Sequence, residues 1–377
     1  MERVRGWWAS YHFQGTPSFI LSKKLRALKG DIKTWNRTVF GNVGVLIKEK
    51  VDELKVLELA AKGGGLSEEE RERKRLLCRD LKRALHQEEI SWRQKSKTKL
   101  LKEGDKCTKF FHLMANSNKR YNTLSSNPAA VREHEVNYYE SMFAESMSWR
   151  PRLGDLNFES LSAGEASSLE APFLEKEVID VIFGMDGNKA PGPDGFSLAY
   201  FLACWDVLKE DIMAVFSDFH VRGKFEKSIN SPFISLIPKV FGASELKDFR
   251  PISPVSGIYK IISKVLANRL RLVMNNIIST PHNAFVKSRQ ILDFVLIANE
   301  ILDFHLKSGK LGLLCKLDME KAYDHVNWDF MLYLLRRCGF GQKLCSWIAF
   351  CISLASFCVL INGLPAGFFN NSRGVRF

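Results

Sequence analysis

At 377 residues with 46% hydrophobic content, the chain is long and apolar enough to bury cores in two or more domains, which excludes a disordered tail. Its net charge of +13 is uneven: residues 1–150 carry +11, residues 151–200 carry −6 and residues 201–377 carry +8. Two basic regions around an acidic one favour a polyanionic partner such as nucleic acid, because lysine and arginine side chains release counterions when they neutralise phosphates.

The cysteines and the N-terminus favour an intracellular protein, in the nucleus or the cytoplasm. The eight cysteines form no CxxC pair and no zinc-type spacing, so we expect reduced, mostly buried thiols. The N-terminal residues contain no apolar core of the kind that a secretory signal needs. The 18 uncharged residues from Leu344 to Ile361 are diluted by serine and cysteine. We interpret them as a buried helix leading into a β-hairpin and not as a membrane span.

Helical spacing dominates the N-terminal part of the chain. Apolar residues recur every three or four positions from Phe19 to about Lys62, and glycines around Gly41 predict a break into two helices. Ser67 and Glu70 then form a capping-box pattern for a long charged helix that runs to about residue 101.

Basic and aromatic residues interleave between Trp92 and Arg120. Such a mixture suits phosphate contacts combined with base stacking, and we predict nucleic-acid binding here. The alternative is an amphipathic helix whose lysines extend their charged ends into solvent. The predicted nucleic-acid-binding residues are Lys106, Lys109, Lys119 and Arg120. Residues 128–173, which combine an amphipathic patch around Tyr139 with an acidic stretch, form the expected connecting segment.

Helices and short strands alternate in the following part of the chain. We predict a helix at Glu175–Met185, two tight turns in Asn188–Phe196, an apolar helix from Ser197 to about Val221, strands at Phe233–Lys239 and Asp248–Ser253, and a helix from Ile258 to about Ile278. On the last helix we expect Lys264, Arg269 and Arg271 to face outward.

The stretch from Gly312 to Cys338 combines a strand pattern, an acid and a helix. The apolar run Leu313–Leu317 predicts a short buried strand that Asp318 closes. Asn327 is the expected cap of a helix that ends before Gly339. A carboxylate at a strand end can hold a divalent metal, although an isolated aspartate in this position is as readily an exposed loop residue.

The run Asp318-Met-Glu-Lys-Ala-Tyr-Asp324 resembles the palm motif of reverse transcriptases. The resemblance implies that Asp318 is the catalytic ligand of two Mg²⁺ ions and that Tyr323 stacks on the incoming sugar and rejects a 2′-hydroxyl. The two predicted strands resemble the paired finger strands of the family, in which Lys239 and Arg250 would grip the triphosphate of the dNTP. We expect Lys321, Asp324 and His325 to be solvated or to form local hydrogen bonds.

Two further motifs extend the resemblance. Asn188-Lys-Ala-Pro-Gly-Pro-Asp-Gly-Phe196 is similar to a run that shapes the fingers of retroelement reverse transcriptases near the template. Asn283 to Asp293 resembles another family element, in which Arg289 would contact the template backbone. Ser288 stands where the family has glycine, and we expect it to strain a turn that glycine accepts freely.

The segment from Trp92 to Arg120 is similar to the link between endonuclease and polymerase in plant non-LTR (LINE-type) retrotransposon proteins. The resemblance therefore implies an α+β fold: a helical basic linker region at 1–127, a connecting segment at 128–173, and the fingers and partial palm of a right-hand polymerase at 174–377. The implied partners are an RNA template, a DNA primer and a dNTP. No membrane is expected, and the sequence does not allow a protein partner to be predicted.

The end of the sequence bears on activity. The family supplies its second set of catalytic carboxylates as an Ala-Asp-Asp hairpin, and residues 330–377 contain neither Asp nor Glu. Two-metal nucleotidyl transfer needs both sets. We therefore expect a C-terminally truncated reverse transcriptase fragment with little or no polymerase activity of its own, which leaves its status as an enzyme uncertain. The alternatives are a non-catalytic nucleic-acid-binding remnant and a decayed reading frame.

Overall fold

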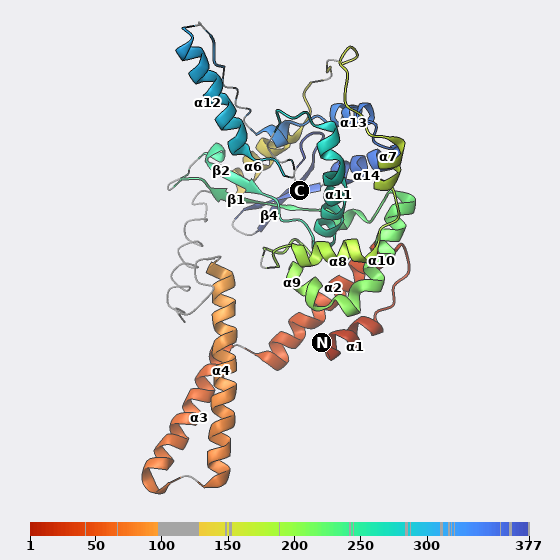
Figure 1. Cartoon of the computed structure of the whole chain (residues 1–377). Helices are drawn as coiled ribbons and strands as arrows, with labels where there is room; N and C mark the ends of the chain where they lie inside the picture. Colours follow the sequence, from red (N-terminus) through yellow and green to blue (C-terminus); the bar gives the residue numbers. More distant parts are fainter. Residues whose placement is uncertain are drawn as a thin grey trace.

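The computed structural model describes the chain except for residues 42, 66, 97–127, 148, 151–152, 188, 241–242, 244, 283–285, 287, 310–311, 316, 318, 320, 355, 362–363 and 376–377. The described residues form a helical body around one small sheet, from which two arms project (Figure 1). The helices of the body are α1 (Glu2–Ser10), α2 (Pro17–Trp35), α6 (Pro128–Phe143), α7 (Ala163–Leu169), α8 (Glu175–Gly184), α9 (Leu198–Ala203), α10 (Trp205–Arg222), α11 (Gly257–Ile277), α13 (Trp328–Arg337) and α14 (Gln342–Ser353). The arms are the pair α3 (Val43–Gly64) and α4 (Glu68–Ser96), and the single helix α12 (Ile291–Lys307).

The sheet joins two hairpins. Its order is β2-β1-β3-β4, with bounds β1 Phe233–Pro238, β2 Phe249–Ile252, β3 Ser356–Ile361 and β4 Leu364–Asn370. β1 pairs antiparallel with β2 and parallel with β3, and β3 pairs antiparallel with β4. The parallel pair connects segments that are far apart in the sequence, and such a pair requires a long crossover. The strands predicted at Phe233–Lys239 and Asp248–Ser253 are confirmed, and the mixture of helices with a small sheet agrees with the expected α+β class.

The larger core lies among the helices. Apolar side chains of α2, α8, α10, α11 and α14 pack into one buried cluster. Leu21, Leu25 and Leu28 of α2 belong to it because they recur on one helix face, while Thr16 caps that helix by accepting a hydrogen bond from the Phe19 amide (3.2 Å). Helices α1 and α2 are therefore part of the same packed body as the helices around the sheet.

The smaller core lies between α6 and the sheet. The Phe143 ring stacks on Phe357 of β3 and Phe369 of β4, with centroid separations of 5.4 and 6.1 Å. Tyr139, one turn earlier on α6, is also buried. The expected connecting segment thus contains a helix that covers one face of the sheet.

Most predicted helix boundaries are confirmed. The capping box at Ser67 forms, since the Glu70 amide donates to its hydroxyl (3.2 Å) and the Ser67 amide donates to the Glu70 carboxylate (2.9 Å). Asn327 caps α13 through the Phe330 amide (2.8 Å), and Gly339 follows with a φ of 79°. The apolar helix predicted from residue 197 is divided into α9 and α10 at Cys204.

The prediction that Arg269 faces outward is wrong. The side chain is buried at 6% exposure and forms an ion pair with Glu177 (2.8 Å). Its guanidinium also donates to the carbonyls of Leu169, Ala171 and Pro172. The segment between α7 and α8 presents unpaired carbonyls to this face of α11, and an arginine can satisfy several of them at once.

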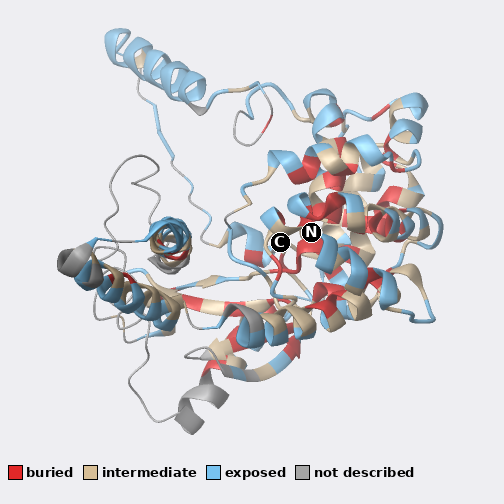
Figure 2. Ribbon diagram, turned by 90° about the horizontal axis from the view of Figure 1, so that it is seen from below, coloured by how far each residue is buried: buried red, intermediate tan, exposed pale blue. Residues whose placement is uncertain are grey.

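The prediction of a buried strand at Leu313–Leu317 is also wrong for the residues that the structure describes. Leu313 is 95% exposed, Leu317 is 86% exposed, and neither lies in a strand. α12, directly before this run, is exposed at every described residue except the half-buried His305 and appears mostly pale blue in Figure 2. An apolar run becomes a strand only when a neighbour pairs with its backbone and covers a face, and no described segment does so here.

The uncharged stretch from Leu344 forms α14 and then β3, as predicted. Among the described helices, none combines the length and the apolar character that crossing a bilayer requires.

Candidate nucleotide site

A cavity of about 730 Å³ opens beside the sheet between β1, β2, α6 and the turn before α13. Three residues predicted to bind the nucleotide, Lys239, Arg250 and Tyr323, all line it. They come from separate parts of the sequence, and the fold brings them together. The remaining lining residues are Tyr138, Tyr139, Met142, Leu246, Lys247, Phe249, Pro251, Ile252, Ser253, Lys321, Asp324 and Val375.

The β1–β2 hairpin positions the two predicted triphosphate ligands. Arg250 lies opposite Ile237 in the antiparallel register, and Lys239 follows the last residue of β1. The Lys239 amide donates to the Asp248 carbonyl (2.7 Å), which continues the pairing by one residue. Both side chains are exposed, and the Lys239 Nζ donates to the Lys247 carbonyl (2.7 Å). The hairpin therefore presents two cations to the cavity from adjacent strands.

Tyr323 lies in a short 3₁₀ turn, η4 (Ala322–His325), that the C-terminal segment holds in place. The Val375 amide donates to the Tyr323 carbonyl (2.9 Å), and the Gly374 amide donates to the Val326 carbonyl (2.8 Å). Gly374 has a φ of 86°, and a Cβ there would lie 2.9 Å from the Asp324 carbonyl oxygen, so only glycine fits without displacement. The ring of Tyr323 is 57% exposed at the cavity wall.

Asp324 differs in part from its prediction. The expected local hydrogen bond forms through its backbone, where its amide donates to the Lys321 carbonyl (2.8 Å). The side chain, however, is buried at 3% exposure and is not solvated. Lys321 adopts a left-handed conformation, with a φ of 52°, which directs the chain into the turn. Asp324 and Tyr323 thus both line the cavity, but Asp324 is buried whereas Tyr323 is exposed.

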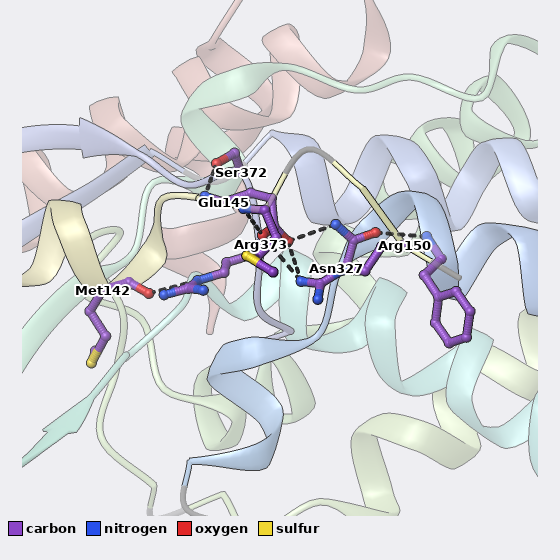
Figure 3. Close-up of polar contacts among 8 residues, drawn as sticks. Met142, Glu145, Arg150, Asn327, Ser372 and Arg373 are labelled. Atoms are coloured by element: carbon purple, nitrogen blue, oxygen red, sulfur yellow. Dashed lines mark hydrogen bonds and ion pairs between the residues drawn. The ribbon is translucent and has the colours of Figure 1, made fainter. Parts of the chain in front are cut away.

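Glu145 links three segments behind the cavity (Figure 3). Its carboxylate accepts hydrogen bonds from the Asn327 side chain (2.6 Å) and from Arg150 (3.0 Å), and its amide donates to the Ser372 hydroxyl (2.7 Å). Arg373 then donates to the Met142 carbonyl (3.0 Å) at the end of α6. The end of α6, the cap of α13 and the end of β4 are therefore held as one unit.

Hydrogen bonding determines the ionisation of Glu145. Its partial desolvation acts to raise the pKa, but the hydrogen bonds from Asn327, the Met147 amide and Arg150, together with the Arg150 charge, lower the pKa to about 2. The carboxylate is thus charged throughout the physiological range.

The position of α6 at the wall of the cavity was not predicted from the sequence. Tyr138, Tyr139 and Met142 of this helix line the cavity, and Glu145 follows its C-terminus. The amphipathic patch around Tyr139 was the available signal, since a helix with one apolar face covers another element.

Arg289, predicted to contact the template backbone, makes its contacts within the protein. Its guanidinium donates to the carbonyls of Ser279 (2.6 Å), His282 (2.8 Å) and Ile278 (2.8 Å), just beyond the end of α11. Ser288 has the expected positive φ, 68°. Asp318, Lys106, Lys109, Lys119 and Arg120 lie outside the described residues.

The described residues do not assemble a metal centre. In the part of the chain that the structure describes, no three His, Cys, Asp or Glu side chains are grouped so that they could hold a metal ion. At the cavity the described carboxylate is Asp324, and one buried carboxylate does not match the oxygen ligands that a two-magnesium site needs.

The described residues thus combine a small mixed sheet, flanked by helices, with a cavity at its side that several basic side chains line. Residues 237–377 match the family described as reverse transcriptase (RNA-dependent DNA polymerase), which supports a reverse transcriptase domain in this part of the chain. The match includes Lys239, Arg250 and Tyr323, whereas α6 lies outside it.

Two relatives are named as proteins of mobile elements. The chain is 26% identical over 294 residues to the "Transposon TX1 uncharacterized 149 kDa protein" of Xenopus laevis, covering 75% of this chain and 22% of that protein. It is 26% identical over 185 residues to the "Retrovirus-related Pol polyprotein from type-1 retrotransposable element R2" of Nasonia vitripennis, covering 48% of this chain and 17% of that protein. The chain thus spans about a fifth of the length of these curated relatives.

Proposed function

We propose that the chain is the finger region and first part of the palm of a non-LTR retrotransposon reverse transcriptase, and that the cavity beside the sheet binds the incoming dNTP. The observation that carries the proposal is the convergence of Lys239, Arg250 and Tyr323 on one cavity. The reverse transcriptase match over residues 237–377 and the two mobile-element relatives support it. We also propose a plant element and an intracellular location, on the sequence resemblance.

The charge of the cavity suits a triphosphate. Its lining contains four cationic side chains, Lys239, Lys247, Arg250 and Lys321, against one carboxylate, that of Asp324. Lys247 pairs with Glu245 (2.6 Å), and Asp324 is buried, so Lys239 and Arg250 remain the cations of the hairpin without an acidic partner among the described residues. Hydrogen bonds from such cations to phosphate are short and strong.

Tyr323 supports discrimination between sugars. Its half-exposed ring stands on a turn that two backbone hydrogen bonds hold to the C-terminal segment. A rigid aromatic wall beside the sugar position can exclude a 2′-hydroxyl by contact.

Asp318 is the one residue that we propose as a magnesium ligand. When bound, the ions would neutralise charge that develops during nucleotidyl transfer. Because the described residues do not form a matching ligand set, we derive no catalytic step through the metal. Because residues 330–377 contain neither Asp nor Glu, we propose that a polypeptide of these 377 residues binds nucleotide without extending a primer.

Nucleotide titration tests the proposal. We expect Lys239→Ala combined with Arg250→Ala to weaken dGTP binding by roughly tenfold or more, because each charged hydrogen bond contributes about 1.5–3 kcal/mol. The matched control is Lys176→Ala combined with Arg271→Ala, which removes two exposed charges from α8 and α11. Equal losses in the two double variants, measured by calorimetry, would refute the assignment of the cavity.

Primer extension tests the statement about activity. With an RNA template, a DNA primer and Mg²⁺, we expect no template-dependent incorporation by the 377-residue polypeptide. Incorporation that disappears in Asp318→Ala would contradict this expectation.

A non-catalytic nucleic-acid-binding role is the second candidate. The net charge of +13 and the sequence resemblance of Trp92–Arg120 to the basic linker segment support it. RNA binding that weakens steeply with salt, without dGTP binding, would select this role over the first.

A further inference from the structure

A second cavity, of about 530 Å³, lies on another part of the body. α2 forms one wall, and the others come from the loop at Pro193 and Asp194, the short helix η2 (Lys227–Asn230) and the start of α11. It shares no lining residue with the cavity beside the sheet. It also lies outside the matched residues 237–377 except for Ser256 and Ile258.

Three cations on one face of α2 border this cavity. Lys23, Arg26 and Lys29 recur every third residue, so their side chains lie along the same side of the helix. The Lys29 ammonium is fixed, since it donates to the Pro193 carbonyl (3.1 Å). Within the described part of the chain, Lys23 and Arg26 have no acidic partner, whereas the neighbouring Lys24 forms an ion pair with Asp211 (2.9 Å). Lys23 and Arg26 are thus available to an anion.

Two acidic residues also line the cavity, and they offset only part of the positive charge on α2. Asp194 accepts hydrogen bonds from the amides of Gly257 (2.8 Å) and Phe196 (3.3 Å), which commits its carboxylate to the backbone. Glu226 is the other lining acid. Three cations against two acids leave a positive balance, and it is concentrated on α2.

An aromatic ring lies next to the free charges. Phe19 lines the cavity, and the Lys23 ammonium is 5.1 Å from the centre of its ring. The hydroxyls of Ser22 and Ser228, which also line the cavity, are hydrogen-bonded to each other (3.1 Å). Cations for the phosphates and an aromatic ring for a base are the groups with which proteins bind single-stranded nucleic acid. The serine hydroxyls add hydrogen-bonding groups that a sugar can use.

The walls are rigid before any ligand arrives. A Cβ on Gly192 would lie 2.2 Å from the Val255 carbonyl oxygen, so the loop is packed tightly against the segment before α11. The buried Ser256 donates to the Ile229 carbonyl (2.5 Å) and caps α11 through the Tyr259 amide (3.4 Å). A preformed cavity binds without a large ordering cost.

We propose that this cavity binds a nucleotide of a single-stranded nucleic acid, with a phosphate at Lys23 and Arg26 and a base on Phe19. Such a site would hold a strand on the helical side of the body, apart from the dNTP cavity. The proposal stands independently of the function proposed for the dNTP cavity.

Binding of labelled 12-nucleotide strands, measured by fluorescence anisotropy over a range of salt concentrations, tests the site. We expect Lys23→Glu combined with Arg26→Glu to weaken binding about tenfold or more and to reduce the slope of log K against log salt by about 0.7, since one phosphate contact on a single strand contributes about 0.7. Lys176→Glu combined with Arg271→Glu is the control, with the same change in net charge away from the cavity. Equal losses in the two double variants would overturn the proposal.

Photochemical cross-linking identifies the peptide that contacts the strand. Binding of the strand to other basic segments of the chain therefore does not obscure the result. A 4-thiouridine strand irradiated with the full chain is expected to cross-link within α2, and Phe19→Leu should remove that cross-link while the thermal melt is retained. Cross-links confined to other peptides would refute the site. The experiment is repeated with RNA and DNA strands of one sequence, in which 4-thiothymidine replaces 4-thiouridine in the DNA. The comparison shows which nucleic acid the α2 cavity prefers.

The dGTP titration separates the two assignments. The α2 variants should bind dGTP as the wild type does, whereas the Lys239 and Arg250 variants should retain the α2 cross-link. Loss of dGTP binding on substitution at α2 would show that the cavities are not independent and would overturn the proposal.

Discussion

Two glutamates, one within α6 and one just beyond its C-terminus, experience opposite environments. Glu145, beyond its C-terminus, is surrounded by donors from Asn327, Met147 and Arg150, and its pKa falls to about 2. Glu135, within the helix, is buried at 3% exposure, and desolvation raises its pKa to about 7. Charge is favoured at the first position and disfavoured at the second, so the two residues predict opposite responses of stability to pH.

Glu145→Gln should reduce the acid sensitivity of the fold. The pKa in the folded state lies below the ordinary value of 4.5, so the stabilisation is complete above about pH 4.5 and is lost as the pH falls toward 2. The difference in melting temperature between wild type and variant should therefore shrink as the pH falls from 5 to about 2.5. A constant difference over this range, followed by calorimetry, would contradict the assignment.

Glu135→Gln should stabilise the protein at high pH. The pKa in the folded state lies above the ordinary value of 4.5, so the penalty of ionisation is absent below about pH 4.5, grows as the pH rises and is complete above about pH 7. We expect a gain on the order of 1–2 kcal/mol at pH 8 and none at pH 4.5. Chemical denaturation measures it, and Glu140→Gln, an exposed change on the same helix, should show no such dependence.

At the scale of elements, Arg269 shows how one side chain joins segments. From α11 it reaches Glu177 at the start of α8 and the carbonyls between α7 and α8, while its guanidinium lies 4.2 Å from the centre of the Phe173 ring. The apolar periodicity of α11 was sufficient to predict the helix. It could not predict that one arginine on it would face inward, because the carbonyls that attract it belong to another segment.

Arg269→Ala should cost about 3–5 kcal/mol of unfolding free energy, because it leaves Glu177 and several carbonyls without their donor. Arg269→Lys should recover only part of that loss, since an ammonium lacks the planar fork of five N–H groups. Arg271→Ala on the exposed face of α11 is the control and should change stability by less than about 0.5 kcal/mol. Chemical denaturation measures the free energy of unfolding. Equal values for Arg269→Ala and Arg269→Lys would show that the geometry of the guanidinium group does not contribute to stability.

At the scale of the whole molecule, the exposed apolar surface of α12 and the following run is the most unusual feature. Leu296, Phe304, Leu306 and Leu313 are each more than half exposed, and they extend over two consecutive segments. Contiguous apolar surface of this kind promotes association or marks an interface.

We expect the 377-residue polypeptide to bind a hydrophobic dye such as ANS in its folded state and to self-associate as its concentration rises. Leu296→Lys combined with Phe304→Lys should lower both signals without changing the melting temperature by more than about 2 °C, because neither side chain is buried. Val221→Lys, at an isolated exposed position at the end of α10, is the control. If the α12 substitutions leave dye binding unchanged, the dye binds to another part of the protein and the prediction is wrong.

The sequence by itself determined the local elements and the chemical type of the residues proposed to bind the nucleotide. The capping box at Ser67, the cap at Asn327 and the strands around Lys239 follow from interactions between near neighbours, which are encoded where they occur. The strand expected at Leu313 failed because pairing depends on a partner segment that local pattern does not specify. Only the tertiary structure decided that α6 closes the cavity, that Arg269 is buried and that α2 borders a second cavity. These features depend on surfaces that meet after distant segments have packed together, and a periodic pattern carries no information about which partner a surface will meet.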